Sequence, residues 1–181
     1  YHFPNLSMVG VIDADAGLMG GDIRAIERTY NLLQQVSGRA GRSKKIGKVF
    51  IQTYYPNHSV IQSFKERDRS SFIKQLLEER KHFNIPPFSF MTAIIISSSS
   101  KVKAEAYANQ LTKEYPLENE IKIFGPVEAP IFLLRGLYRY RLLLKGNKRN
   151  NLNSFTRRLI EKIPPTQSVK LIIDVDPYTF L

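Results

Sequence analysis

The sequence of 181 residues contains no cysteine. This excludes a disulfide framework and a zinc site built on thiolates. Its unbroken apolar runs, such as residues 93–96 and 131–134, are far too short to span a bilayer. The N-terminus shows no secretory signal, and the absence of cysteine is compatible with the cytoplasm. We therefore expect a soluble globular protein rather than a membrane-embedded one.

Acidic residues are also few. The sequence has 16 aspartates and glutamates but 27 lysines and arginines, which gives a formal charge of +11 and a pI near 9.9. Such a balance predicts a polyanionic partner, with nucleic acid ahead of an anionic membrane. A hydrophobic content of 43% suffices for a core in one large or two small domains. Because the chain begins at Tyr1 without an initiator methionine, we interpret it as a piece of a longer protein.

The first fifty residues have the pattern of a strand, a helix and a second strand. Met8 to Ile12 is an unbroken apolar run typical of a strand buried on both faces, and Lys48 to Thr53 reads as another. Between them, apolar residues recur at helical spacing from Arg24 to Val36, with Asp22 as the expected N-cap. This order predicts a parallel sheet, and a sheet this incomplete is expected to expose a hydrophobic edge.

Asp13 and Asp15 close the first strand. Two carboxylates at a strand end can hold a metal or act as acid and base, but a loop pair of this kind more often caps the chain through hydrogen bonds. The structural role is the favoured interpretation.

The stretch Gln35 to Arg42 reads Q-V-S-G-R-A-G-R and follows the predicted helix directly. Two glycines end the helix and hold Arg39 and Arg42 in a short bend. Paired guanidinium groups beside a nucleotide can stabilise charge on a transferring phosphoryl group, and Gln35 can order a water or a phosphate oxygen. The same residues also fit a glycine C-cap followed by solvated arginines, and spacing alone leaves both interpretations open.

A helical pattern resumes from His58 to Phe83, with Asp68 as the expected cap of the second of two helices, and ends at Ile85-Pro86-Pro87-Phe88. We place a domain boundary there, which gives domains 1–85 and 86–181. In the second domain we expect strands at 91–97, 121–125, 131–134, 137–145 and 169–175, a helix capped by Ser100 that runs to about 115, and a helix beginning at Asn151 or Asn153. If 131–134 and 137–145 form one broken strand or hairpin, this is the order of an α+β ferredoxin-like domain.

One stretch of this second domain contains basic residues and no acidic ones. Between residues 135 and 158 there is no acidic residue and there are eight basic ones: Arg135, Arg139, Arg141, Lys145, Lys148, Arg149, Arg157 and Arg158. Strand alternation puts Arg139, Arg141 and Lys145 on one face, opposite Tyr138, Tyr140, Leu142 and Leu144. The stretch predicts contacts to phosphate backbones, and an ordinary solvated surface is the alternative. The two tyrosines are expected in the core, although they could also stack on unpaired bases.

The pattern Q-x-x-G-R-x-G-R resembles motif VI of superfamily 2 helicases. The resemblance implies a RecA-like second lobe in which Arg42 is the arginine finger on the γ-phosphate of ATP, with Arg39 and Gln35 beside it. The partial lobe would then be followed by the basic ferredoxin-like domain.

Longer runs resemble the family of primosomal replication-restart helicases (primosomal protein N′) over essentially the whole chain. They are Y-H-F-P-N-L-S-M-V-G-V-I-D-A-D, R-x-x-E-R-T from Arg24 to Thr29, I-Q-T-Y-Y-P-N-H, L-E-E-R-K-H-F-N-I-P-P-F and D-V-D-P-Y-T-F-L. The resemblance implies an ATP-dependent 3′ to 5′ DNA helicase of the bacterial cytoplasm. It would bind forks and single strands, and contact primosome proteins and the single-strand binding protein. It also places His2 in motif V.

The chain also lacks three sequence features of that family. The chain has no G-x-x-x-x-G-K-[ST] phosphate loop, no D-E-x-H motif and no cysteine-rich zinc insert. ATP and Mg²⁺ would be held mainly by another lobe of the parent protein, and Zn²⁺ by another part of it, so we expect this chain to be inactive as an ATPase alone. Two alternatives stay open: a non-catalytic ferredoxin-like nucleic-acid-binding adaptor, and another superfamily 2 translocase.

Overall fold

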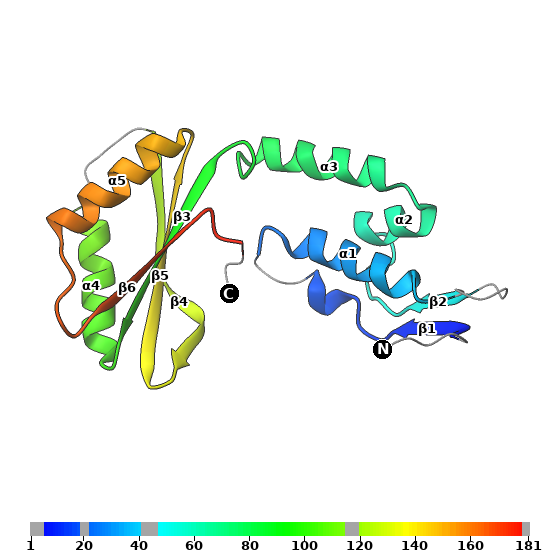
Figure 1. Ribbon diagram of the computed structural model, residues 1–181, viewed down its shortest axis with the longest axis horizontal. Helices are drawn as coiled ribbons and strands as arrows, with labels where there is room; N and C mark the ends of the chain where they lie inside the picture. Colours follow the sequence, from blue (N-terminus) through cyan, green and yellow to red (C-terminus); the bar gives the residue numbers. More distant parts are fainter. Residues whose placement is uncertain (1–5, 19–21, 41–46, 115–119, 179–181) are drawn as a thin grey trace. The chain divides into compact units, whose positions relative to one another are not determined.

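The structure is a computed structural model that describes residues 6–18, 22–40, 47–114 and 120–178. The chain divides into two compact units, Tyr1–Glu79 and Arg80–Leu181, which carry the labels of Figure 1. The division falls inside helix α3 (Arg69–His82), a few residues before the boundary that the sequence suggests at Ile85 to Phe88. We describe each unit by itself.

The first unit begins with the expected strand, helix and strand. Strand β1 (Met8–Val11) and strand β2 (Lys48–Ile51) pair in parallel, from Met8 opposite Lys48 to Val11 opposite Ile51. The 3₁₀ turn η1 (Asp15–Gly17) and helix α1 (Ala25–Ser37) lie between them in the chain. The prediction of a parallel sheet with a connecting helix is therefore confirmed.

Helices complete the core of the first unit. Helix α2 (Ser59–Glu66) and α3 follow β2, and Asp68 caps α3 by accepting from the Ser71 amide, as predicted. The Tyr30 ring of α1 stacks on Phe72 of α3 with centroids 4.2 Å apart. Around this pair the core contains Ala14, Leu33, Val60, Ile61 and Leu76.

The strands of the first unit are only half buried, which corrects one expectation. Met8 is 60% exposed, and Gly10 and Phe50 are also exposed, whereas Val11 and Ile51 pack against the core. Among the described residues this sheet has two strands, so one face of each strand meets the helices and the other meets solvent. Met8 and Phe50 thus leave hydrophobic side chains on the solvent face of the strands, and the hydrophobic sheet edge stays a prediction.

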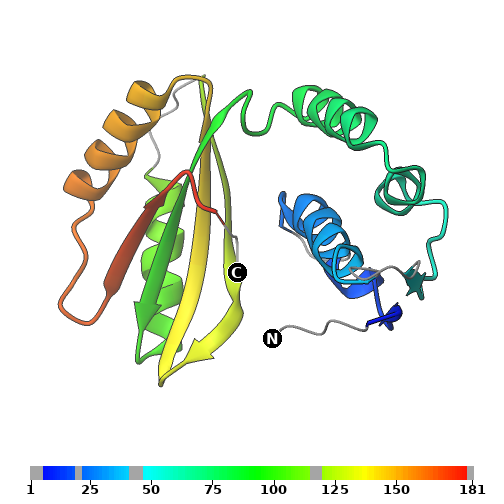
Figure 2. The same ribbon diagram turned by 45° about the vertical axis from the view of Figure 1, so that its right-hand side comes forward.

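The second unit is an antiparallel four-stranded sheet with two helices on one face. Its strands are β3 (Phe90–Ser98), β4 (Ile121–Leu134), β5 (Leu137–Gly146) and β6 (Lys170–Val175), in the order β4-β5-β3-β6. Helix α4 (Lys101–Lys113) and helix α5 (Arg149–Lys162) cover the same face, as Figures 1 and 2 show from two sides. Among the described residues of this unit, no helix packs against the other face.

The core of the second unit lies between the helices and the covered face. Its fully buried side chains include Ile94, Ile96, Leu111, Leu142, Leu144, Leu152 and Phe155. Burying a large aliphatic or aromatic side chain contributes about 1.5–3 kcal/mol. Ser100 caps α4 as predicted, since its hydroxyl accepts from the Lys103 amide.

Two elements of the second unit differ from the expectation. Residues 121–134 form one strand, with register irregularities between Phe124 and Val127 and between Glu128 and Leu133. The pairing with β5 continues past each irregularity, which is why the strand is not broken. Helix α5 begins at Arg149 rather than at Asn151 or Asn153, and its N-cap residue Lys148 makes no side-chain capping hydrogen bond.

Candidate nucleotide and nucleic-acid interfaces

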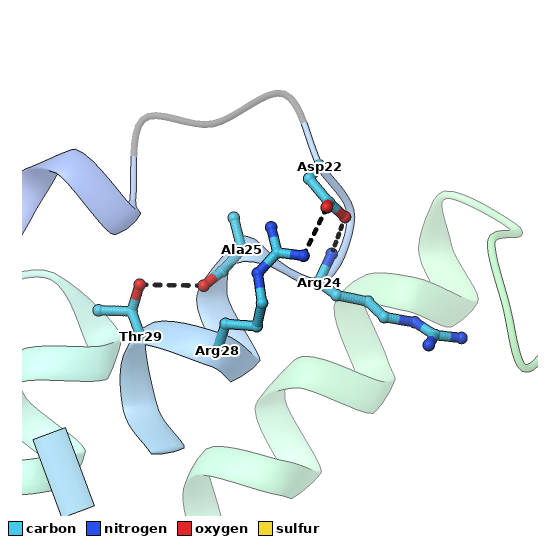
Figure 3. Close-up of polar contacts among 5 residues, drawn as sticks. All are labelled: Asp22, Arg24, Ala25, Arg28 and Thr29. Carbon is cyan, nitrogen blue, oxygen red and sulfur yellow. Dashed lines mark hydrogen bonds and ion pairs between the residues drawn. The ribbon is translucent and has the colours of Figure 1, made fainter. Parts of the chain in front are cut away.

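The N-terminal end of α1 is anchored by a buried carboxylate. Figure 3 shows Asp22 accepting from the Arg24 amide at 2.9 Å and pairing with the Arg28 guanidinium at 2.7 Å. One turn later the Thr29 hydroxyl donates to the Ala25 carbonyl at 3.0 Å. The N-cap residue of α1 is Arg24, so Asp22 is not the cap that the sequence suggests. It anchors the residue before the helix and an arginine within it.

The C-terminal end of α1 presents Gln35 and Arg39 on its exposed side. The helix ends at Ser37, and the turn continues with bonds from the Arg39 amide to Val36 and from the Ala40 amide to Ser37. Gln35 belongs to the last turn of α1, and Arg39 lies two residues after the helix. The structure thus exposes two of the three residues expected at a nucleotide near the end of α1, whereas Arg42 and His2 lie outside the described residues.

Gly38 has an ordinary right-handed helical conformation, with φ of −66°. The left-handed conformation that a glycine C-cap normally uses is therefore absent at this position. A Cβ built on Gly38 would meet only the Gln34 and Gln35 carbonyl oxygens, at 3.4 and 3.7 Å. The backbone geometry does not by itself require glycine here, which weakens the plain C-cap interpretation.

Asp13 and Asp15 form a structural hydrogen-bond network. The Asp13 carboxylate accepts from the amides of Asp15 and Ala16. Buried Asp15 accepts from the Thr53 hydroxyl and, at 2.7 Å, from the Tyr54 amide. This network ties the segment after β1 to the segment after β2, in agreement with the favoured interpretation. Within the described ranges, no group of three or more histidine, aspartate or glutamate side chains is placed to hold a metal ion.

The second unit separates the basic residues that are adjacent in sequence. Tyr140, Leu142 and Leu144 lie in the core under the helices, as predicted, which puts Arg139, Arg141 and Lys145 on the helix-free face. Arg141, however, is only 7% exposed. Neighbouring strands enclose it on both sides, through Val127 of β4 and Ile95 of β3. The expectation that Arg141 belongs to an exposed basic surface is therefore corrected.

The remaining basic residues lie in three different places. Arg135 is exposed at the turn between β4 and β5, with φ of 51°. Lys148 and Arg149 begin α5 and meet acidic residues from elsewhere in the chain: Glu120 at 4.0 Å and Asp176 at 2.8 Å. Arg157 and Arg158 belong to α5, on the helix-covered side. The basic residues between 135 and 158 therefore do not form one surface. Carboxylates from other parts of the chain also lie beside some of them.

The Lys145 side chain contacts a backbone carbonyl and an aromatic ring. Its ammonium group donates to the Phe83 carbonyl at 3.3 Å and lies 5.9 Å from the centre of the Phe124 ring. Burial, and to a smaller extent repulsion by Lys122, lower the pKa of Lys145. Sequence reasoning missed Phe83, Lys122 and Phe124. The register of β4 on β5 brings Lys122 and Phe124 to Lys145, and a hydrogen bond to its carbonyl brings Phe83 there.

These observations define a class: a mixed α/β protein whose second unit carries basic and aromatic side chains on a helix-free sheet face. The family model described as the primosomal protein N C-terminal domain matches residues 81–178, and the chain belongs to this family. The match covers nearly the whole of the described second unit.

Curated relatives extend the similarity to the first unit. The chain is 43% identical over 180 residues to the replication restart protein PriA of Rickettsia conorii. It is 33% identical to the proteins of the same name from Bacillus subtilis, over 184 residues, and Haemophilus influenzae, over 180 residues. These alignments cover 98–99% of this chain but only 28%, 23% and 25% of the respective relatives. The chain thus spans about a quarter of the length of these proteins.

No helix in the described part of the chain is both long enough and apolar enough to cross a bilayer.

Proposed function

We propose that this chain supplies part of an ATP-dependent 3′ to 5′ DNA helicase that acts in replication restart. The observation that carries the proposal is the similarity to proteins named replication restart protein PriA, which runs through both units and 99% of the chain. The helicase activity rests on the resemblance of Gln35 to Arg42 to motif VI.

In this proposal the first unit is the end of a RecA-like second lobe, supported by its parallel strands joined through α1. The second unit is a ferredoxin-like domain. Its support is the sheet order β4-β5-β3-β6 with every neighbouring pair antiparallel, which is the arrangement of a split βαβ sandwich.

Gln35 and Arg39 fit the phosphate end of a nucleotide. Both are exposed at the end of α1, and a guanidinium and an amide are suitable donors for phosphate oxygens. ATP would supply the phosphoryl group whose transfer to water drives the helicase. The residues of this chain would hold charge at its γ-phosphate: Arg42 as the finger, with Arg39 and Gln35 orienting the phosphate oxygens.

The described residues do not fit a metal site. Asp13 and Asp15 are engaged in hydrogen bonds, and no other carboxylates converge within the described ranges. We assign Mg²⁺ and Zn²⁺ to other parts of the parent protein and derive no step through either. The partners proposed for the parent protein are forked and single-stranded DNA, primosome proteins and the single-strand binding protein, in the bacterial cytoplasm.

The proposal is tested by Arg42→Ala in the full-length protein. Removing an arginine finger should reduce ATP turnover by about a thousandfold or more, because the charge of the transition state loses its partner. DNA affinity, measured by fluorescence anisotropy on a labelled fork, should change less than about twofold by the same reasoning. Arg69→Ala, which removes an exposed arginine from α3, is the matched control and should leave both quantities unchanged.

The competing function is a non-catalytic nucleic-acid-binding adaptor, in which Gln35 to Arg42 is a plain helix end. That alternative is favoured if the wild-type full-length protein binds DNA but turns over no ATP. Turnover that survives Arg42→Ala would instead contradict the role of Arg42 as the finger. Equal loss of turnover and DNA affinity would also contradict the assignment, because it would indicate a general structural defect.

A further inference from the structure

The helix-free face of the second unit can be followed row by row across the sheet. Residues opposite each other in an antiparallel pair point to the same face. One row runs from Phe124 on β4 through Leu143 on β5 and Ala93 on β3 to Asp174 on β6. The next row towards the end of β5 places Lys122 directly opposite Lys145. Two lysines and an aromatic ring therefore adjoin on the β4 side of this face.

Two exposed phenylalanine residues contact Lys145. Phe124 is 47% exposed and Phe83 is 65% exposed. The Lys145 ammonium lies over the Phe124 ring and donates to the backbone carbonyl of Phe83. Phenylalanine is ordinarily buried, so exposed rings beside basic groups are candidates for a binding surface.

The lysine pair places two positive charges side by side on this face. Like charges directly opposite each other destabilise a sheet. Burial is the main cause of the lowered pKa of Lys145, and repulsion by Lys122 is the second. Among the described residues, Asp174 lies on β6 at the opposite edge of the sheet, and Glu120 and Asp176 are paired with Lys148 and Arg149. An anionic group between Lys122 and Lys145 would reduce the repulsion.

We propose that Phe124, Phe83, Lys122 and Lys145 form a binding site for an unpaired DNA strand. One base stacks on Phe124 and another base of the same strand on Phe83, while phosphates of that strand meet the two lysines. Stacking needs an open base face, which a single strand offers and the interior of a duplex does not. The inference rests on the proposed function in one respect, namely that DNA is the polyanion.

The sharpest test is Phe124→Ala in the 181-residue chain. We would measure binding to a labelled oligothymidylate and to a blunt duplex of equal length by fluorescence anisotropy at one salt concentration. Loss of one stacking ring should weaken single-strand binding by about 5- to 100-fold. Duplex binding should change by less than about twofold, because phosphate contacts alone carry it.

Two further variants separate stacking from folding. Phe124→Tyr keeps an aromatic face and should retain single-strand affinity within about twofold, even if Phe124→Ala lowers stability. Val102→Ala removes an exposed apolar side chain from α4, on the covered side of the sheet, and should change neither affinity. Lys145→Gln should reduce the slope of log affinity against log salt by about 0.7 for the single strand, the amount expected for one phosphate contact.

The outcomes distinguish this site from the proposed function. If the wild-type chain binds DNA and Phe124→Ala weakens single-strand and duplex binding equally, or neither, the stacking site is refuted and the DNA-binding function stands. If the wild-type chain binds no DNA at low salt, the DNA-binding role of this chain fails and the site fails with it.

Discussion

Replacing Tyr107 with phenylalanine removes a single oxygen atom from the packing between α4 and α5. The buried Tyr107 hydroxyl donates to the Ile163 carbonyl at 2.6 Å, which links the middle of α4 to the C-terminal end of α5. Without the hydroxyl, that carbonyl loses its side-chain donor in a buried environment. Such a loss costs about 1–3 kcal/mol.

The expected effect is large enough to measure by thermal unfolding. For a domain of roughly 100 residues, each 1 kcal/mol lowers Tm by about 4–8 °C, so the transition of the second unit should fall by about 4–24 °C. Circular dichroism and calorimetry of the 181-residue chain would both report it. Tyr54→Phe is the matched control, because Tyr54 is 89% exposed and its hydroxyl is solvated in both states.

The pH dependence gives a second readout of the same hydroxyl. Burial raises the pKa of Tyr107, so the folded state holds this proton more tightly than the unfolded chain. The resulting stability is fully present below the unfolded pKa of about 10 and is lost as the pH rises through the folded value. Tyr107→Phe removes this contribution, so the difference in stability between wild type and variant should shrink above about pH 10. Burial raises the pKa of Tyr140 as well, so part of the alkaline loss should persist in the variant.

A Tm change equal to that of Tyr54→Phe would refute the reasoning, because it would mean that the hydroxyl contributes nothing to the packing. A stability difference that stays constant across the alkaline range would refute the linkage to the proton.

Two further substitutions test the backbone and the carboxylate network. Gly125→Ala should lower the stability of the second unit by about 1–3 kcal/mol, because Gly125 has φ of +100° and a Cβ there would lie 2.8 Å from the Arg141 carbonyl oxygen. Gly136→Ala, at φ of +77° with no atom within 4 Å of its Cβ, should cost less in urea unfolding, and the reverse order would contradict the argument. Asp15→Ala should destabilise the first unit by about 2–3 kcal/mol, since the Thr53 hydroxyl and the Tyr54 amide lose their acceptor. Faster hydrogen exchange at the Tyr54 amide would report that loss, and unchanged exchange would contradict it.

Regular elements were the most predictable part of the fold. Helix α1 was expected at Arg24 to Val36 and spans Ala25–Ser37, and the Ser100 cap of α4 was identified correctly. These features depend on residues within one or two turns of each other. The start of α5 was missed because the prediction relied on an asparagine cap, whereas the N-cap residue is Lys148 and makes no side-chain capping hydrogen bond.

The candidate sites were predictable to different extents. Gln35 and Arg39 were expected side by side at the end of a helix, and the structure exposes both there. Whether they meet a nucleotide stays a prediction, as does every DNA contact named from the basic stretch. For that stretch, alternation assigned Arg139 and Arg141 to the correct face of β5, but only the neighbouring strands show that Arg141 is enclosed.

The sequence by itself determined which segments are helices and strands, which side chains lie on each face of β5, and the strong positive charge. Each of these depends on composition or on a period of two to four residues. Tertiary structure alone decided which charges share a surface. Lys122 and Lys145 are 23 positions apart in the sequence (145 − 122) and become neighbours through the register of β4 on β5. Arg149, inside a stretch without acidic residues, meets Asp176 once β6 is in place. Strand pairing joins residues distant in the chain, and no local pattern specifies which residues will be joined.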